Sequence, residues 1–352
     1  MALNPSSVSR LLVRSTNWLG DAVMSLPAIR AIHQVFPHAQ VAVVARPWVA
    51  DLYARESSID RVILYPVQKG LRAKREFAAR LREERFDAAI LLQNAFDAAL
   101  IAWLAGIPER IGYNRDARGL LLTRAIPVPE PGDIPRHERF YYLELLRRAA
   151  LIERFPPSDA ILLEGIDAAR RGGAEHLAAL GISTPAIGIS PGAAYGNAIR
   201  WLPERFAAVA RSFPAASILL FGSAAERELC QSVAAQLPDS HNFAGRTTLR
   251  EFIDLAAACR LFLTNDSGAM HVSSALGVPT VAIFGATDDT TTGPAGPLAR
   301  VVRAHAECSP CLLRECPIDH RCMTAVTTEM AVAAALQLWE ESAPAWTHET
   351  KF

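Results

Sequence analysis

One short segment decides the fold, because an apolar run in it ends in small and polar residues: Leu261-Phe262-Leu263-Thr264-Asn265-Asp266-Ser267-Gly268. The run predicts a buried strand, and the residues up to Leu276 predict a helix. The first N–H groups of such a helix lack partners within it and point, with the positive end of the helix dipole, at one spot. The turn is therefore a candidate phosphate-binding site.

Three residues at this turn favour anion binding. Gly268 has no side chain to keep an anion from the backbone, Ser267 carries a hydroxyl, and His271 lies one helical turn further on. The alternative is that Asp266 or Ser267 only caps the helix, which is the commoner role of an isolated Asp-Ser-Gly. The rest of the chain decides between the two readings.

Length and composition indicate a two-domain α/β protein. A chain of 352 residues exceeds one ordinary core, and 51% hydrophobic residues supply material for buried parallel sheets. Lys+Arg and Asp+Glu both number 36, so the zero net charge does not favour nucleic-acid binding. We expect a cytoplasmic protein with reduced or metal-bound cysteines, because no segment is typical of a membrane span or a signal peptide.

Short apolar strands alternate with helical segments in both halves, which predicts two doubly wound parallel sheets. The strands are expected at 11–13, 41–44, 62–64 and 88–92, and then at 187–189, 218–221, 261–263 and 281–284. Each strand of the second set ends in small or polar residues, and such ends outline a binding crevice. A composition shift near Gly172 predicts domains 1–172 and 173–328. Residues 329–352 are expected to form a C-terminal helix and tail, for which the first domain is one candidate packing partner.

Candidate catalytic residues follow two of the predicted strands, the one at 11–13 and the one at 187–189. Asp21 falls at a helix start near Pro27, where that helix begins or bends, and its carboxylate suits a general base or, alternatively, a helix-stabilising acid. Ser190 to Ala193 form a small-residue loop suited to a diphosphate. Arg200 could neutralise a leaving phosphate, or stack on Trp201 at the surface. Neither a Walker A motif nor Gly-x-Gly-x-x-Gly is present.

A cysteine-rich segment and a basic segment can each be interpreted in more than one way. Cys308-x2-Cys311-x4-Cys316-x5-Cys322, beside His320, suits a structural zinc, although the last two cysteines are not the close pair of a zinc ribbon, so metal binding is not favoured. Residues 69–85 hold seven basic and three acidic residues, typical of a solvated helix face or of a surface that meets an anionic partner. Thr248 and Glu251 predict a structural capping box.

Three segments together resemble the ADP-heptose:lipopolysaccharide heptosyltransferases, glycosyltransferase family 9. They are 17–24 (NWLGDAVM), 264–271 followed by 279–288 (PTVAIFGATD), and the cysteine block 308–323, which is most similar to that of the heptosyltransferases II. The resemblance implies a GT-B fold of two Rossmann-like domains facing across a cleft. It also implies transfer of heptose with inversion from ADP-L-glycero-D-manno-heptose to the first heptose of heptosyl-Kdo2-lipid A. No cofactor or catalytic metal is implied, and the enzyme would be cytoplasmic and peripheral to the inner membrane.

The resemblance also implies roles for residues. Asp21 becomes the general base, Asp266 a contact to the donor heptose, and Glu226 a ligand of the ribose hydroxyls. The remaining donor-binding candidates are Ser190, Gly192, Ala193, Arg200, Ser267, Gly268, Met270, His271 and Thr287. The acceptor-binding candidates are Asn17, Trp18, Gly20, Arg72 and Arg75.

One departure concerns the leaving group. The family usually has a lysine before the Arg/His-Trp pair, and here that position is Ile199. Either Arg200 takes over the role of the lysine, or the donor differs. Three alternatives therefore stay open: another family 9 transferase with a different donor, a sugar-nucleotide isomerase or epimerase on a similar fold, and a zinc- or iron–sulfur-containing binding module. The sequence indicates no oligomeric state.

Overall fold

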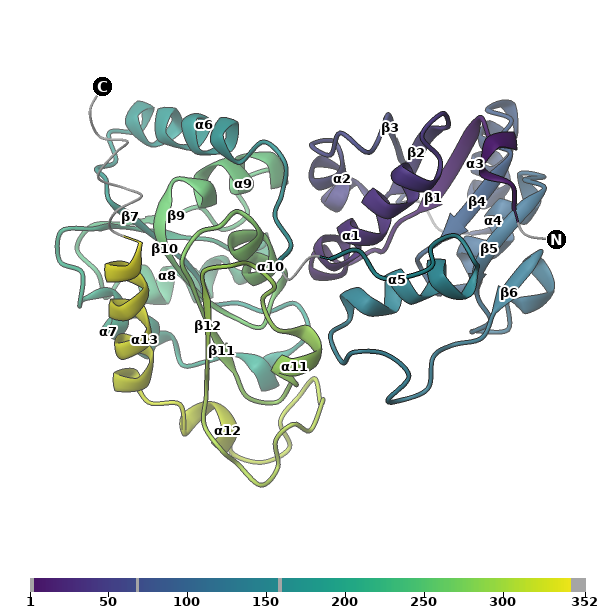
Figure 1. The fold of residues 1–352 in the computed structure, drawn as a ribbon. Coiled ribbons are helices and arrows are strands. Elements are labelled where there is room, and N and C mark those ends of the chain that lie inside the picture. Colours follow the sequence, from purple (N-terminus) through teal and green to yellow (C-terminus); the bar gives the residue numbers. More distant parts are fainter. Residues whose placement is uncertain (1–2, 68–69, 158–159, 343–352) are drawn as a thin grey trace. The chain divides into compact units, whose positions relative to one another are not determined.

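The computed structural model describes residues 3–67, 70–157 and 160–342, and the chain divides into two compact units, 1–159 and 160–352 (Figure 1). Each unit contains a six-stranded sheet whose strand pairs are all parallel. Helices connect the strands and cover the sheets. The predicted α/β class and doubly wound organisation are confirmed.

The first sheet has the order β3-β2-β1-β4-β5-β6. Its strands are β1 (Arg10–Arg14), β2 (Gln40–Ala45), β3 (Arg61–Leu64), β4 (Ala88–Leu91), β5 (Glu109–Tyr113) and β6 (Arg124–Ile126). The helices of this unit are α1 (Leu19–Val35), α2 (Pro47–Tyr53), α3 (Leu71–Glu83), α4 (Phe96–Leu104) and α5 (Arg139–Arg148). Helix α1 packs against α2 and α5, and α3 packs against α4.

The second sheet has the order β12-β11-β10-β7-β8-β9, which repeats the topology of the first. Its strands are β7 (Ala186–Ser190), β8 (Ser217–Leu220), β9 (Ser240–Asn242), β10 (Cys259–Asn265), β11 (Thr280–Phe284) and β12 (Ala299–Arg303). Its helices are α6 (Ile166–Ala179), α7 (Pro203–Ala210), α8 (Arg227–Ala234), α9 (Leu249–Ala257), α10 (Gly268–Ala275), α11 (Asp289–Thr292), α12 (Arg321–Thr324) and α13 (Thr328–Glu341). In both sheets the strand order reverses beside the first strand, where open α/β sheets bind ligands.

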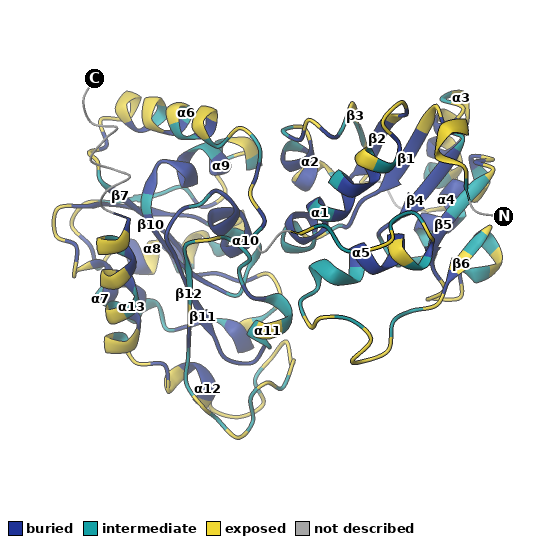
Figure 2. Ribbon diagram, viewed as in Figure 1, coloured by how far each residue is buried: buried dark blue, intermediate teal, exposed yellow. Residues whose placement is uncertain are grey.

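All eight predicted strands are present, and the sequence analysis missed β5, β6, β9 and β12. Seven of the predicted strands are apolar runs that are mostly buried, as Figure 2 shows for the centre of each sheet, and the eighth, β3, is an apolar run at the sheet edge that is partly exposed. The missed ones are partly exposed and carry charged or polar residues, as in β9 (SHN) and β12 (ARVVR). Such strands lack the continuous apolar run that marks a buried one.

The domain boundary predicted near Gly172 lies inside α6, whereas the two compact units of the structure divide earlier, between residues 159 and 160. A Cβ atom on Gly173 would overlap the backbone of Asp254, so this glycine allows α6 to pack closely on α9. The composition shift therefore reflects helix packing. Helix α13 packs on α7 and on β10 to β12, with Ala335 and Leu338 in the core of the second unit.

Helix α1 begins at Leu19 and continues through Pro27, so Asp21 lies in its first turn. Of the two alternatives at Pro27, a helix that begins near this residue is wrong. Proline has no N–H to donate, but the surrounding side chains are buried and hold the helix together. The predicted capping box is confirmed: Thr248 accepts a hydrogen bond from the Glu251 N–H, and Glu251 accepts one from the Thr248 N–H.

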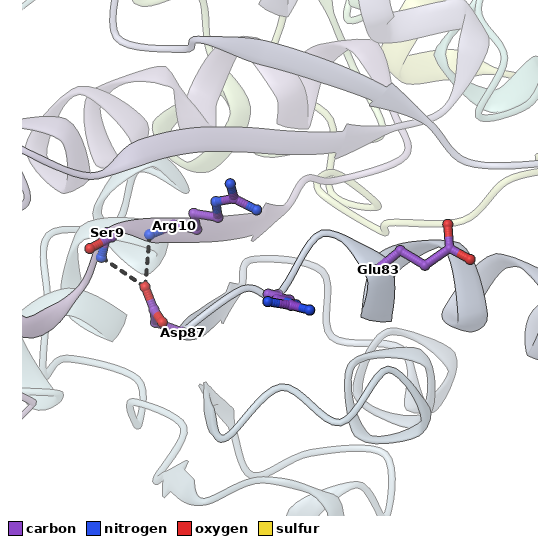
Figure 3. Close-up of a pocket in the computed structure, with 5 residues that line it drawn as sticks. Ser9, Arg10, Glu83 and Asp87 are labelled. Carbon is purple, nitrogen blue, oxygen red and sulfur yellow. Dashed lines mark hydrogen bonds between the residues drawn. The ribbon is translucent and has the colours of Figure 1, made fainter.

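A cavity of about 470 Å³ lies at the amino edge of the first sheet, lined by Ser9, Arg10, Glu83, Arg85 and Asp87 (Figure 3). The Asp87 carboxylate accepts hydrogen bonds from the backbone N–H groups of Ser9 and Arg10, at 2.8 and 2.9 Å. These bonds attach the start of β1 to the start of β4. Because ligands bind at the carboxyl edge of such sheets, we interpret this cavity as structural.

Candidate active site

The turn after β10 is organised by Asn265, a residue that the sequence analysis gave no role. Its buried amide donates to the Pro191 carbonyl at 2.7 Å, and its Oδ1 accepts from the Trp201 N–H at 2.9 Å. One side chain thus connects the ends of β7 and β10 and the loop that precedes α7. Its position after an apolar run was the available signal, but only the fold identifies its partners.

Ser267 caps helix α10, so the capping alternative is confirmed for this residue. Its Oγ accepts from the Met270 N–H at 3.4 Å and shares a 3.0 Å hydrogen bond with the Thr264 hydroxyl. Gly268 is the first residue of the helix. The remaining N–H groups of the first turn keep their capacity to bind an anion.

Asp266 does not cap the helix. Its carboxylate accepts a hydrogen bond from Thr292 of α11 at 3.2 Å. Burial raises the pKa of Asp266 to about 6, although the Thr287 and Thr292 hydroxyls oppose the shift. A half-buried carboxylate with few partners is suited to binding sugar hydroxyls.

Glu226 lies against the loop after β7. Its Oε2 accepts two hydrogen bonds from Ser223, from N–H and Oγ, both at 2.8 Å. A Cβ atom on Gly192 would overlap its Oε1, so the glycine makes room for the carboxylate. The structure therefore brings Glu226 and Gly192 together at the carboxyl edge of the second sheet.

Arg200 and Ile199 have opposite surroundings. Ile199 is 2% exposed and belongs to the hydrophobic core of the second unit. The Arg200 Nη2 donates to the Ala193 carbonyl at 3.0 Å, while its buried Nε has no hydrogen-bond partner among the described residues. Because Trp201 is buried against Phe206, the structure does not support the alternative of a surface Arg200–Trp201 stack.

The other donor-binding candidates differ in burial. Met270 is a core residue packed with Ala282 and Phe284, so its side chain does not face a ligand site. Ala193 is buried in the core, and Ser190, His271 and Thr287 are buried near the ends of β7, β10 and β11.

The cysteine loop, residues 304–320, connects two loops of this edge. The Leu312 N–H donates to the Ala286 carbonyl, and the Ala198 N–H donates to the Arg314 carbonyl. All six cysteines are free, and the buried Cys322 of α12 lies close enough to the loop cysteines Cys308, Cys311 and Cys316 for their charges to raise its pKa, in addition to the larger effect of burial. Within residues 3–67, 70–157 and 160–342, no group of three or more His, Cys, Asp or Glu side chains could hold a metal ion.

In the first unit, Asp21 is a half-buried acid in the first turn of α1, at the carboxyl edge of the sheet. Burial raises its pKa to about 6. Burial also raises the pKa of Glu138, which precedes α5, and the charge of Asp21 adds to that shift. A carboxylate with a pKa near neutrality is suited to general base catalysis. Asn17, Trp18 and Gly20 lie in the segment that leads to Asp21.

Of the basic candidates on α3, both Arg72 and Arg75 are exposed, and Arg72 pairs with Glu76 at 2.8 Å. Lys69, the first residue of the basic run, lies outside the described residues.

Comparison with known proteins agrees with this geometry. The model of glycosyltransferase family 9 (heptosyltransferase) matches residues 74–321. The chain belongs to glycosyltransferase family 9. It is 32% identical over 307 residues to lipopolysaccharide heptosyltransferase 2 of Escherichia coli, covering 84% of this chain and 88% of the relative. It is 28% identical over 324 residues to lipooligosaccharide heptosyltransferase 2 of Haemophilus influenzae, covering 83% and 88%.

The solved structure of the E. coli ADP-heptose heptosyltransferase II matches this family 9 chain with a TM-score of 0.80 at 28% identity, covering 95% of this chain and 99% of the other. A family 9 protein from Veillonella parvula has the same fold, with a TM-score of 0.82 at 22% identity over 97% and 99% of the two chains. These matches confirm the GT-B architecture. They also decide between enzyme classes: this family 9 protein is a glycosyltransferase, not an isomerase or a binding module. No helix among its described residues is long and apolar enough to cross a membrane.

Proposed function

We propose that this protein transfers heptose, with inversion, from ADP-L-glycero-D-manno-heptose to the first heptose of heptosyl-Kdo2-lipid A. The observation that carries the proposal is the turn at β10, where Asp266, the α10 N-terminus and Asn265 lie beside the β7 loop at the switch point of the second sheet. The relatives that act as heptosyltransferases 2 support the heptose donor and the lipopolysaccharide acceptor.

In this mechanism the second domain binds the donor. The N–H groups at the start of α10, with Ser267, Gly268 and His271, bind the diphosphate, and the Ser190–Ala193 loop covers it. Asp266 binds the heptose and Glu226 the ribose hydroxyls. Arg200, rather than a lysine at position 199, supplies the cation for the departing ADP, because a guanidinium binds phosphate oxygens in pairs. These charges take the place of a catalytic metal.

The first domain supplies the base. Asp21 removes a proton from an acceptor hydroxyl, whose oxygen attacks the anomeric carbon from the face opposite the ADP. The C–O bond to the diphosphate breaks, and ADP leaves with the bonding electrons. A carboxylate whose pKa is about 6 is ionised at neutral pH and basic enough to assist this step.

We also propose that the enzyme works on the cytoplasmic face of the inner membrane, held peripherally. The exposed residues of α3 include Arg72, Arg75 and Arg80, beside the exposed Leu71. A basic surface with an apolar residue at its end suits the anionic headgroups around a lipid-linked acceptor.

The test is incubation with ADP-heptose and heptosyl-Kdo2-lipid A, followed by measurement of released ADP and product mass, with and without EDTA. We expect stoichiometric ADP and one added heptose, unchanged by the chelator. Ile199 is the specific observation that favours a second candidate, a family 9 transferase with a different donor, so ADP-glucose and ADP-mannose are compared in parallel. Faster turnover of either sugar would replace the heptose assignment, and ADP release without acceptor would contradict the transfer.

A further inference from the structure

The carboxyl edge of the first sheet carries a group of charged residues that the proposed mechanism leaves without a role. We call it the edge cluster: Arg14, Arg46, Tyr65, Lys74 and Asp97. Arg14 ends β1, Arg46 precedes α2, Tyr65 follows β3, and Lys74 and Asp97 lie on α3 and α4. Four segments of the chain therefore bring their charges to one edge.

Two arginines share one aromatic ring in this cluster. The guanidinium carbons of Arg46 and Arg14 lie 4.2 and 4.7 Å from the centre of the Tyr65 ring. Burial is the main cause that lowers the pKa of Arg14 to about 10; the charge of Arg46 contributes to the lowering, and Tyr65 and Asp97 oppose it. Two like charges are held together where solvent screens them poorly.

The cluster contains only one carboxylate to offset these charges. Asp97 pairs with Lys74 and accepts the Tyr65 hydroxyl hydrogen bond. Three cations against one carboxylate leave a formal surplus of two positive charges, and this carboxylate is already engaged. A bound anion would relieve the repulsion between the two arginines.

The hydrogen bonds of the two arginines lead to neutral acceptors. Arg14, 4% exposed, donates to the carbonyls of Ser15 and Val44 and to Asn17 Oδ1, at 2.8, 3.1 and 3.0 Å. Arg46 donates to the Pro66 carbonyl at 2.8 Å. The buried Nε atoms of both have no hydrogen-bond partner among the described residues. The charges are therefore solvated by dipoles and not neutralised.

Two exposed tryptophans flank the cluster. Trp48 is 51% exposed and Trp18 is 59% exposed. The Trp48 indole N–H donates to the Asn17 carbonyl at 2.8 Å, and the Arg46 guanidinium lies 5.5 Å from its ring. An exposed indole fixed beside a cation offers an apolar face and a charge together, which suits a ring-shaped ligand that carries an anionic group.

We propose that Arg46 and Trp48 bind an anionic sugar of the acceptor, one that carries a carboxylate or a phosphate. This proposal rests on the proposed function and names the substrate class of the acceptor site. Arg46 binds the anionic group and Trp48 stacks on the sugar ring. Arg14 is a positioning residue, because it is buried against the Tyr65 ring that it shares with Arg46 and donates a hydrogen bond to Asn17, four residues before Asp21.

The decisive variants are Arg46→Gln and Trp48→Ala, with Trp48→Phe as the conservative replacement. Arg61→Gln is the matched control, because Arg61 is an exposed arginine at the amino edge of the same sheet, paired with Glu84. We expect Arg46→Gln to raise the KM for the acceptor roughly 10- to 100-fold while kcat and the KM for ADP-heptose stay unchanged. We expect Trp48→Phe to restore most of what Trp48→Ala loses. An acceptor KM for Arg46→Gln equal to that of Arg61→Gln would overturn the proposal.

Modified acceptors distinguish the two anionic groups. The probes are the delipidated heptosyl-Kdo2 oligosaccharide, its Kdo methyl esters, and its derivatives with and without phosphate. If Arg46 binds a carboxylate, esterification weakens acceptor binding to the wild type and does not change binding to Arg46→Gln. If Arg46 binds a phosphate, removal of the phosphate weakens binding to the wild type and does not change binding to Arg46→Gln. Equal binding of all probes to the wild type contradicts the proposal.

Binding is also measured by tryptophan fluorescence without donor, which separates the two proposals. If acceptor binding requires the anionic group and Arg46→Gln abolishes that requirement, the edge-cluster site is supported even if no heptose is transferred. Normal heptose transfer, with acceptor binding that does not depend on the anionic group, would support the proposed function and overturn this inference.

Discussion

The two sheets have the same strand order, but their carboxyl edges are built from different residues. In the second domain small and neutral groups, Gly192, Asn265 and Ser267, surround a helix N-terminus, and the charged side chains of Glu226, Asp266 and Arg200 lie beside them. In the first domain the edge carries the buried Arg14 and the half-buried Arg46, both against the Tyr65 ring, together with the exposed Trp18 and Trp48.

This difference indicates how one topology serves two ligands. Backbone N–H groups and close approach suit a diphosphate, which has the same charge in every donor. Side-chain charges and aromatic faces suit a particular sugar and its substituents. We therefore expect substitutions at the first edge to change catalysis and acceptor use, and substitutions at the second edge to change donor affinity, together with folding where the residue also holds the edge together.

The strongest test of the comparison is Asp21→Asn. Because the amide cannot accept the proton of the acceptor hydroxyl, we expect kcat to fall about 10²- to 10⁴-fold. The affinity for ADP-heptose, measured by calorimetry, should stay within a factor of about two. Asp116→Asn, the same change at an exposed position of this domain, serves as the control. Near-normal turnover of the Asp21 variant would remove the base assignment.

Ile199→Lys tests whether the second edge tolerates a side-chain cation at this position. The position is in the core, so we expect the charge to lower the free energy of unfolding by about 3–5 kcal/mol. Urea denaturation measures the loss, and Ile199→Leu is the volume-matched control. A stable variant with tighter ADP-heptose binding would mean that this side chain faces the donor.

Asn265→Ala should affect folding and donor binding together. It leaves the Trp201 N–H and the Pro191 carbonyl without partners, and we expect a loss of about 2–4 kcal/mol in unfolding free energy. Asn265→Asp keeps the acceptor but not the donor, so its loss should be intermediate. Equal stability of all three proteins in urea would show that the amide does not hold this edge together.

Gly192→Ala is expected to weaken ADP-heptose binding while leaving the stability of the protein nearly unchanged. The new Cβ would overlap the end of the Glu226 side chain, which is flexible enough to move at little cost to stability. If Glu226 binds the ribose, ADP-heptose should bind about tenfold more weakly, roughly the value of one hydrogen bond to a charged group. Calorimetry and thermal melting measure the two quantities, and Glu226→Gln should reproduce the weaker binding. Unchanged affinity would leave Glu226 as a cap of the Ser223 turn.

The pH dependence of turnover gives the smallest effect. Burial raises the pKa of Asp21 to about 6, so the active, ionised form is lost as the pH falls through 6. We expect kcat/KM to halve near pH 6 and to fall about tenfold by pH 5. A profile measured with saturating donor checks this, and a midpoint near 4 would indicate an Asp21 that is open to solvent.

Much of the fold and part of the site could be predicted from local sequence. Continuous apolar runs identified eight of the strands, and the Thr248 and Glu251 pair identified its helix start, because both signals depend on neighbours along the chain. The turn from Asp266 to Gly268 was predicted for the same reason. The weaker strands β9 and β12 were missed, since their residues take extended structure only beside a strand already in place.

The sequence by itself determined the two doubly wound sheets, the family and the turn at β10, because these follow from hydrophobic periodicity and from residues close together in the chain. Only the tertiary structure decided that Gly173 is a helix contact, that Met270 and Ile199 are core residues, and that Asn265 connects two strand ends. It also decided that Arg14 and Arg46 share the Tyr65 ring. The physical reason is distance: burial and charge proximity depend on segments that are far apart in sequence and adjacent only after folding.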